Sequence, residues 1–135
     1  MEIYSLIKSC GGSFATVVSP FAYVSSLAKI GEGTIIMHHA LVASHATIGK
    51  NCIINSKALI EHDAQIGDDC HISTGAIVNG TSILTGQTFL GSGSTVIDKV
   101  TIAGGCIIGA GSLVIRSIEE SGTYIGNPLK KLIPL

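Results

Sequence analysis

The chain has 135 residues, a formal net charge of −1, and hydrophobic residues at 46% of its positions. That length fits one modest domain, and the near-neutral charge leaves no basic patch for nucleic acid or anionic lipid. The first ten residues do not form a signal peptide, and no stretch reaches the ~20 consecutive apolar residues of a membrane span. We therefore expect a cytoplasmic protein with no nucleic-acid or membrane partner.

The first element in chain order is short. The opening residues, MEIYSLIKSC, predict one short helix or an extended segment, and no strand followed by GxGxxG occurs before the regular part of the chain begins. Residues 1–17 are therefore expected to form an N-terminal segment.

From residue 18 to residue 119 the sequence repeats every six residues. Read from Val24, the hexads are VSSLAK, IGEGTI, IMHHAL, VASHAT, IGKNCI, INSKAL, IEHDAQ, IGDDCH, ISTGAI, VNGTSI, LTGQTF, LGSGST, VIDKVT, IAGGCI, IGAGSL and VIRSIE. A period of six fits neither an amphipathic helix nor a simple strand. It fits a short strand followed by a corner, with three hexads in each triangular coil and coils stacked about 4.8 Å apart.

Two places in each hexad are predicted to point inward. The first place always holds Val, Ile or Leu, and the fifth holds Ala, Thr, Cys, Ser, Val or Ile. Cys52, Cys70 and Cys106 fall at the fifth place and should be small buried side chains, and the four cysteines show no zinc spacing. Glycines at the second and fourth places should supply corner dihedrals that a Cβ resists.

This hexad pattern resembles that of the left-handed β-helix proteins. The resemblance implies an all-β fold: a left-handed parallel β-helix of hexapeptide repeats, about six coils long, over residues 18–119, with a short C-terminal tail at 120–135. Proteins of this class are usually homotrimers, and most are acyltransferases that use acetyl-CoA or acyl carrier protein.

The stretch GKNCIINSKALIEHDAQIGDDCHISTGAIVNG is similar to the sialic-acid O-acetyltransferase and bacillosamine-pathway nucleotide-sugar N-acetyltransferase group. The tail GTYIGNPLKKL resembles the closing segment of these enzymes, with Leu129 where Ala is usual. Members of this group normally begin with a small Rossmann-like domain that holds the nucleotide sugar, and residues 1–17 do not resemble it. The resemblance implies acetyl-CoA as co-substrate and a small-molecule sugar acceptor, with N- or O-acetylation left open.

The same resemblance implies the catalytic residues. Acetyl transfer needs a base for the attacking amine or hydroxyl, and a carboxylate beside a histidine orients the imidazole and stabilises the imidazolium. His62, at the third place of its hexad and hence on an outward-facing corner, corresponds to the general base. Asp63 would increase its basicity, and Asn55 would help to position the base or the acceptor.

The donor contacts come from the resemblance as well. His71 corresponds to a contact to acetyl-CoA, and Gly80, one coil beyond His62, corresponds to the glycine whose backbone N–H polarises the acetyl carbonyl. Ser92 and Ala110 match backbone contacts from later coils. His45, one coil before Asp63, is a weaker candidate, and Lys130 and Lys131 either reach the coenzyme A phosphates or belong to a solvated tail.

Two functions from other classes are also compatible with a hexapeptide β-helix. A γ-type carbonic anhydrase would need three histidines on zinc, and the histidine spacing does not supply them, so no metal site is expected. A non-catalytic β-helix that serves as a scaffold or assembly subunit stays open.

Overall fold

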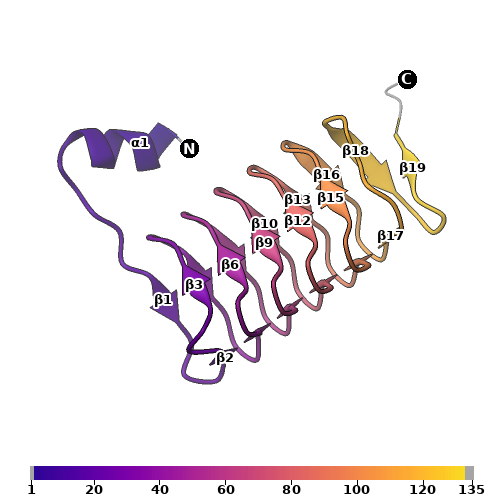
Figure 1. Cartoon of the computed structure of the whole chain (residues 1–135). Helices are drawn as coiled ribbons and strands as arrows, with labels where there is room; N and C mark the ends of the chain where they lie inside the picture. Colours follow the sequence, from indigo (N-terminus) through magenta and orange to yellow (C-terminus); the bar gives the residue numbers. More distant parts are fainter. Residues whose placement is uncertain (1, 133–135) are drawn as a thin grey trace.

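The computed structural model describes residues 2–132 and consists of one short helix followed by a stack of short strands. Helix α1 (Glu2–Ser9) is amphipathic and lies at the N-terminal end. The following chain winds into a left-handed β-helix of about six coils (Figure 1). Both the fold class and the short N-terminal helix are therefore as the sequence predicts.

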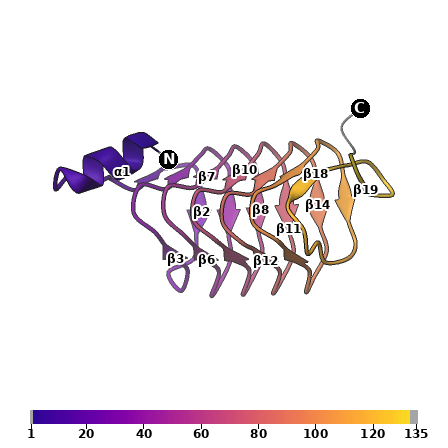
Figure 2. The same ribbon diagram turned by 90° about the horizontal axis from the view of Figure 1, so that it is seen from above.

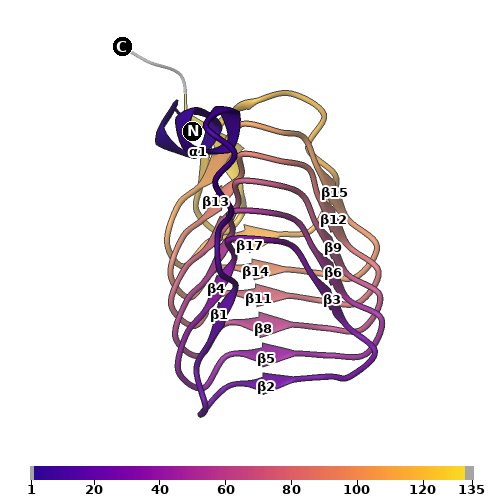
Figure 3. The ribbon, with the colours of Figure 1, turned by 90° about the vertical axis from the view of Figure 1, so that its left-hand side faces the viewer.

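Each coil contributes one strand to each of three sheets, which Figure 3 shows as separate ladders. Sheet A contains, in order, β1 (Val17–Val18), β4 (Ile35–Ile36), β7 (Ile53–Ile54), β10 (His71–Ile72), β13 (Phe89–Leu90), β16 (Cys106–Ile108), β18 (Gly122–Ile125) and β19 (Lys130–Lys131). Sheet B contains β2 (Tyr23–Val24), β5 (Leu41–Val42), β8 (Leu59–Ile60), β11 (Ile77–Val78), β14 (Thr95–Val96) and β17 (Leu113–Val114). Sheet C contains β3 (Lys29–Ile30), β6 (Thr47–Ile48), β9 (Gln65–Ile66), β12 (Ile83–Leu84) and β15 (Thr101–Ile102).

The register between coils is constant over most of the stack. His71 pairs with Ile53 on one side and Phe89 on the other, and Val96 pairs with Val114, so each residue lies beside the one 18 positions away. The named strand pairings among residues 2–132 are parallel, except that β19 runs antiparallel to β18. Residues 18 positions apart therefore lie in columns along the prism, and Figure 2 shows the strands that carry them stacked coil on coil.

The core lies inside the triangle and is built from the first and fifth places of the hexads. First-place residues such as Ile54, Ile60 and Ile72 are fully buried. Fifth-place residues are also buried, including Cys52, Cys70 and Cys106, as predicted from the sequence. The cysteine thiols also link successive coils, since Cys52 Sγ donates to the carbonyl oxygen of Gly67 at 3.1 Å.

The corners depend on glycine in two different ways. At the fourth place the backbone is left-handed, with φ +65° at Gly93 and +58° at Asp63, which bears out that half of the prediction. At the second place the prediction of corner dihedrals was wrong, because Gly31, Gly49, Gly67, Gly91 and Gly109 do not have positive φ. A Cβ on Gly91 would instead lie 2.5 Å from the backbone nitrogen of Ala110, so the second place needs glycine for close stacking of coils.

The outward faces of the three sheets differ in polarity. Sheet A presents Ile35, Phe89 and Ile107, which remain 37%, 40% and 48% exposed. Sheet B presents a similar aliphatic column that includes the exposed Leu41. Sheet C presents mostly polar residues, namely Lys29, Thr47, Gln65 and Thr101, together with Ile83. Two faces of the prism are thus apolar and the third is polar.

Both ends of the solenoid are tied to the coils by side chains. At the N-terminal end the rings of Tyr4 and Phe14 stack with centroids 4.5 Å apart, and Lys8 Nζ lies 3.0 Å from Glu32 Oε1. At the C-terminal end Lys131 Nζ donates to Glu120 Oε2 at 2.7 Å. Among the described residues no helix has the length and apolar character needed to cross a membrane.

Candidate active site

The edge between sheets B and C carries His62 and Asp63, in the corner that joins β8 to β9. Asp63 has φ +58°, and its backbone N–H donates to the carbonyl of Ser44 in the coil below, which fixes the turn. This conformation brings Asp63 Oδ2 to 2.9 Å from His62 Nδ1. Both side chains are more than half exposed, at 60% for His62 and 53% for Asp63.

The carboxylate sets the state of the imidazole. An ionised carboxylate only accepts hydrogen bonds, so Nδ1 carries the proton in this pair and Nε2 of the neutral ring holds the lone pair. The hydrogen bond to Asp63 raises the pKa of His62 above its ordinary value, with smaller contributions from the negative charges of Asp63, Glu61 and Asp98. The arrangement therefore provides an outward-facing base oriented by its neighbour.

Gly80 lies directly beside this base. A Cβ built on Gly80 would lie 2.8 Å from both Cε1 and Nε2 of His62, so a larger residue would displace the ring. The two coils are joined here by a hydrogen bond from Thr81 N–H to the carbonyl of His62. Within residues 2–132 the N–H of Gly80 donates to no carbonyl or side chain, and the residue is buried against the His62 ring.

A second pair, Asn55 and His71, lies on sheet A. Asn55 Nδ2 is 3.3 Å from His71 Nε2, and the rings of His71 and Phe89 are nearly perpendicular, with centroids 5.2 Å apart at 77°. Desolvation lowers the pKa of His71, so the imidazole is neutral at pH 7. His71 is thus a half-buried hydrogen-bonding group beside an exposed aromatic ring.

The two pairs do not meet within one chain. His62 and Asp63 lie on the B–C edge, whereas His71 belongs to β10 in sheet A and Asn55 directly follows β7 in the same sheet. Sheet B separates the two places around the triangle (Figure 3). The residues that the sequence groups into one site therefore form two half-sites on different sides of the prism.

The other candidates are distributed as follows. Ser92 and Ala110 are exposed on the edge between sheets A and B, stacked in adjacent coils, and Gly111 N–H donates to the carbonyl of Ser92 at 2.9 Å. His45 is exposed on the B–C edge one coil below Asp63. The backbone N–H of Asp63 donates to the carbonyl of Ser44 and not to His45. This hydrogen bond therefore gives His45 no role in holding Asp63.

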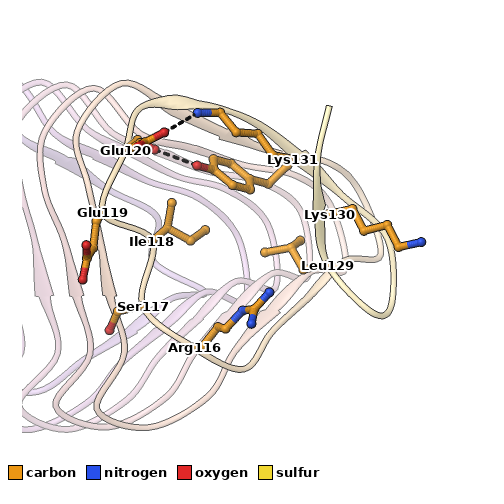
Figure 4. Close-up of a pocket in the computed structure, with 9 residues that line it drawn as sticks. Arg116, Ser117, Ile118, Glu119, Glu120, Leu129, Lys130 and Lys131 are labelled. Atoms are coloured by element: carbon orange, nitrogen blue, oxygen red, sulfur yellow. Dashed lines mark hydrogen bonds and ion pairs between the residues drawn. The ribbon is translucent and has the colours of Figure 1, made fainter. Parts of the chain in front are cut away.

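A hollow also lies away from His62, at the C-terminal end. A cavity of about 520 Å³ is lined by Arg116, Ile118, Glu120, Tyr124, Leu129 and the two tail lysines, among others. Figure 4 shows Ile118 and Leu129 across its centre, with Glu120 paired to Lys131 on its rim. Arg116 follows Val114 as Asp98 follows Val96, and it therefore continues the column of the B–C edge toward this cavity.

Reasoning from the sequence missed Asp98. This exposed carboxylate lies on the B–C edge two coils beyond His62, in the same column as Gly80. Its negative charge contributes to the raised pKa of His62. The 18-residue register itself was the signal that could have identified it.

Comparison with known proteins identifies the repeat. The model of the bacterial transferase hexapeptide family (six repeats) matches residues 27–61 and 45–80. None of the curated proteins compared with the chain matches it significantly.

Solved structures similar to the chain include acetyltransferases. A mutant of perosamine N-acetyltransferase from Caulobacter crescentus, in complex with CoA and GDP-perosamine, is 31% identical with a TM-score of 0.95, and the match covers 98% of this chain and 63% of that one. WeeI from Acinetobacter baumannii is 27% identical with a TM-score of 0.93, covering 97% and 64%. The acetyltransferase domain of PglB from Neisseria gonorrhoeae, in complex with acetyl coenzyme A, is 26% identical with a TM-score of 0.74, covering 97% and 64%. The chain thus spans just under two thirds of each of these proteins.

Proposed function

The chain carries the bacterial transferase hexapeptide repeat in a left-handed β-helix, and we propose that it is an acetyl-CoA-dependent acetyltransferase acting on a nucleotide-linked sugar. The similar solved structures support this proposal, since they contain CoA with GDP-perosamine or acetyl coenzyme A. The acceptor group is an amine or a hydroxyl, and the reaction takes place in the cytoplasm, where acetyl-CoA is available.

The observation that carries the proposal is the arrangement of one imidazole. His62 has Nδ1 engaged by Asp63 at 2.9 Å, while Nε2 faces the space beside Gly80. This is the arrangement that general-base catalysis needs, because the lone pair is on the nitrogen that faces outward.

The reaction follows as direct transfer. The amine or hydroxyl of the sugar attacks the thioester carbon, and His62 Nε2 takes the proton that the nucleophile loses. Asp63 stabilises the imidazolium as it forms, and the N–H of Gly80 stabilises negative charge on the acetyl oxygen. When the C–S bond breaks, the imidazolium returns the proton to the thiolate, which gives the acetylated sugar and free coenzyme A.

The donor would bind between two chains of a homotrimer. Two apolar outward faces support association, because contiguous exposed apolar surface marks interfaces. Association would bring the His62 half-site of one chain near the Asn55–His71 half-site of its neighbour. It would thus unite two half-sites that lie apart within one chain. Ser92 and Ala110 would then add backbone contacts to acetyl-CoA.

The phosphates of the donor would lie toward the C-terminal end. Arg116 is three coils beyond His62 on the same edge, about 14 Å at the usual strand spacing. Lys130 lines the same cavity, and neither cation has a hydrogen-bond or ion-pair partner among residues 2–132. Lys131 is paired with Glu120 and is therefore less available to bind a phosphate.

The test is an acetyl-transfer assay with a matched histidine control. Release of the coenzyme A thiol would be followed with acetyl-CoA and GDP-perosamine or other amino-sugar nucleotides. His62→Ala should lower kcat by about 10²–10⁴-fold, whereas His45→Ala, one coil below on the same edge, should not. Equal rates in the two variants would remove His62 from the mechanism. If the wild-type protein is folded but has no activity, the alternative function as a non-catalytic scaffold would be favoured.

A further inference from the structure

The further inference concerns Asp98 and rests on the function proposed above. Val78 pairs with Val96 in the parallel register of sheet B, so the corner that follows one strand stacks on the corner that follows the other. Gly80 and Asp98 occupy the same place in these two corners. His62, Gly80 and Asp98 consequently form one column along the B–C edge.

The His62 ring occupies the space left by the missing side chain of Gly80, and the gap between that ring and Asp98 is called the notch. His62 reaches up over Gly80, with Nε2 2.8 Å from the position that a Cβ would occupy. Asp98 lies one coil above that position, about 4.8 Å along the axis. The Cβ of Asp98 is therefore within about 8 Å of His62 Nε2. One nitrogen placed between them can be within the ~2.9 Å of a hydrogen bond to both side chains.

The carboxylate of Asp98 is available for such a contact. It is exposed, and the hydrogen bonds and ion pairs of residues 2–132 do not include it. The carboxylates around the notch are those of Glu61, Asp63 and Asp98. The cations are Lys99, adjacent in sequence at the left-handed corner position, and Arg116, one coil beyond Asp98. The acceptor-only carboxylate of Asp98 favours a guest that brings an additional N–H donor.

We propose that Asp98 binds the amino group of the acceptor and makes the enzyme selective for an amino sugar over its hydroxyl counterpart. A primary amine has two N–H donors and one lone pair. One N–H faces His62 Nε2 and is the proton that leaves, and the other donates to Asp98 and directs the lone pair toward the thioester carbon. A hydroxyl has one proton only and cannot serve both groups.

The experiment compares Asp98→Asn with the wild type on two acceptors, GDP-perosamine and its analogue with a hydroxyl in place of the amino group. Steady-state KM and kcat would be measured for each acceptor and for acetyl-CoA at the pH of maximal activity. Asp68→Asn, which removes an exposed carboxylate on the edge between sheets C and A, controls for the change in net charge. Asp98→Asn should raise KM for the amine about 10-fold, because a hydrogen bond to a charged group is lost. Asp98→Glu should restore part of the loss.

The outcomes separate this inference from the function on which it rests. A wild-type protein that releases no coenzyme A thiol with GDP-perosamine, its hydroxyl analogue or the other amino-sugar nucleotides refutes the acetyltransferase proposal itself. A wild-type protein that acetylates GDP-perosamine while Asp98→Asn keeps the same KM refutes only the role of Asp98. A rise in KM for acetyl-CoA instead of the acceptor would move Asp98 to the donor side and overturn the inference, as would preference for the hydroxyl analogue.

Discussion

The imidazole of His62 lies so close to Gly80 that a Cβ on the glycine would be 2.8 Å from Nε2. The two residues are one coil apart, and the backbone of Gly80 has no positive φ that would itself require glycine. The space above this residue is therefore reserved for the histidine ring.

Gly80→Ala should fold normally but lose activity, because the exposed ring of His62 must rotate away from the added methyl group. We expect kcat to fall by about 10²-fold, as for a catalytic group misplaced by about 1 Å. The variant should be measured in the wild-type and His62→Ala backgrounds. If Gly80 acts through the imidazole, the second background shows no further loss; an equal loss in both would mean that the glycine acts independently of His62.

Asp63→Asn should change the pH dependence of the reaction. The hydrogen bond to Asp63 raises the pKa of His62, so in the wild type the rise of kcat/KM with pH should be shifted upward from that of an ordinary histidine. Removing the carboxylate lowers that pKa, which moves the rising limb toward lower pH and reduces the plateau. Asn is the suitable replacement because it tolerates the left-handed backbone at this corner. An unshifted limb would show that another group controls it.

His71→Ala should weaken acetyl-CoA binding. The neutral imidazole is held between Asn55 and Phe89, so its loss removes an oriented polar contact and leaves a gap beside an exposed ring. Calorimetric titration should show a Kd raised about 10-fold, the worth of one good hydrogen bond. His38→Ala, an exposed histidine on the A–B edge about two coils below His71, serves as the control. Identical titrations for all three proteins would exclude His71 from the donor site.

Ile107→Lys should disrupt association between chains. Ile107 is 48% exposed on the apolar face of sheet A, and a lysine there would place a charge in the proposed interface. Thr47→Lys makes the corresponding change on the polar face of sheet C. Light scattering after size exclusion should find a trimer for wild type and Thr47→Lys, and smaller species for Ile107→Lys. If only Thr47→Lys dissociated the trimer, the interface would lie on sheet C and its assignment to sheet A would be wrong.

The two kinds of corner glycine predict different costs for the same substitution. Gly93 has φ +65° with open space around its missing Cβ, so Gly93→Ala should cost about 1 kcal/mol of unfolding free energy. Gly91, two residues earlier, faces the backbone of the next coil at 2.5 Å, so Gly91→Ala should cost about 3 kcal/mol. Thermal or denaturant unfolding would compare them. Equal losses would mean that the coils separate more easily than their stacking implies.

The fold could be predicted from the sequence because one constraint repeats in every hexad. Each coil must bury the first and fifth places of its hexads. Residues as different as Ile60 and Cys70 therefore both point into the core, and their positions in the hexad predict this. The role of second-place glycines could not be predicted, since it depends on the distance between coils. The pairing of β18 with β19 was also unforeseen, because it lies outside the repeat.

The site was predictable in part. Adjacent residues such as His62 and Asp63 can contact each other wherever the backbone turns, so their pair is visible in the sequence. The separation of His62 from His71 is not visible in the sequence, because it depends on which side of the triangle each residue occupies. Asp98 went unnoticed since its relation to His62 exists only through stacking.

The 18-residue register also governs how the chain tolerates insertions and deletions. A deletion of six residues between Gly80 and Asp98 would keep the core pattern, yet it would move Asp98 and Arg116 onto a different side of the prism. A deletion or duplication of a whole coil would keep every column intact and change only its length, by about 4.8 Å. Length variation that preserves this edge should therefore occur in steps of three hexads, with smaller changes confined to the two ends.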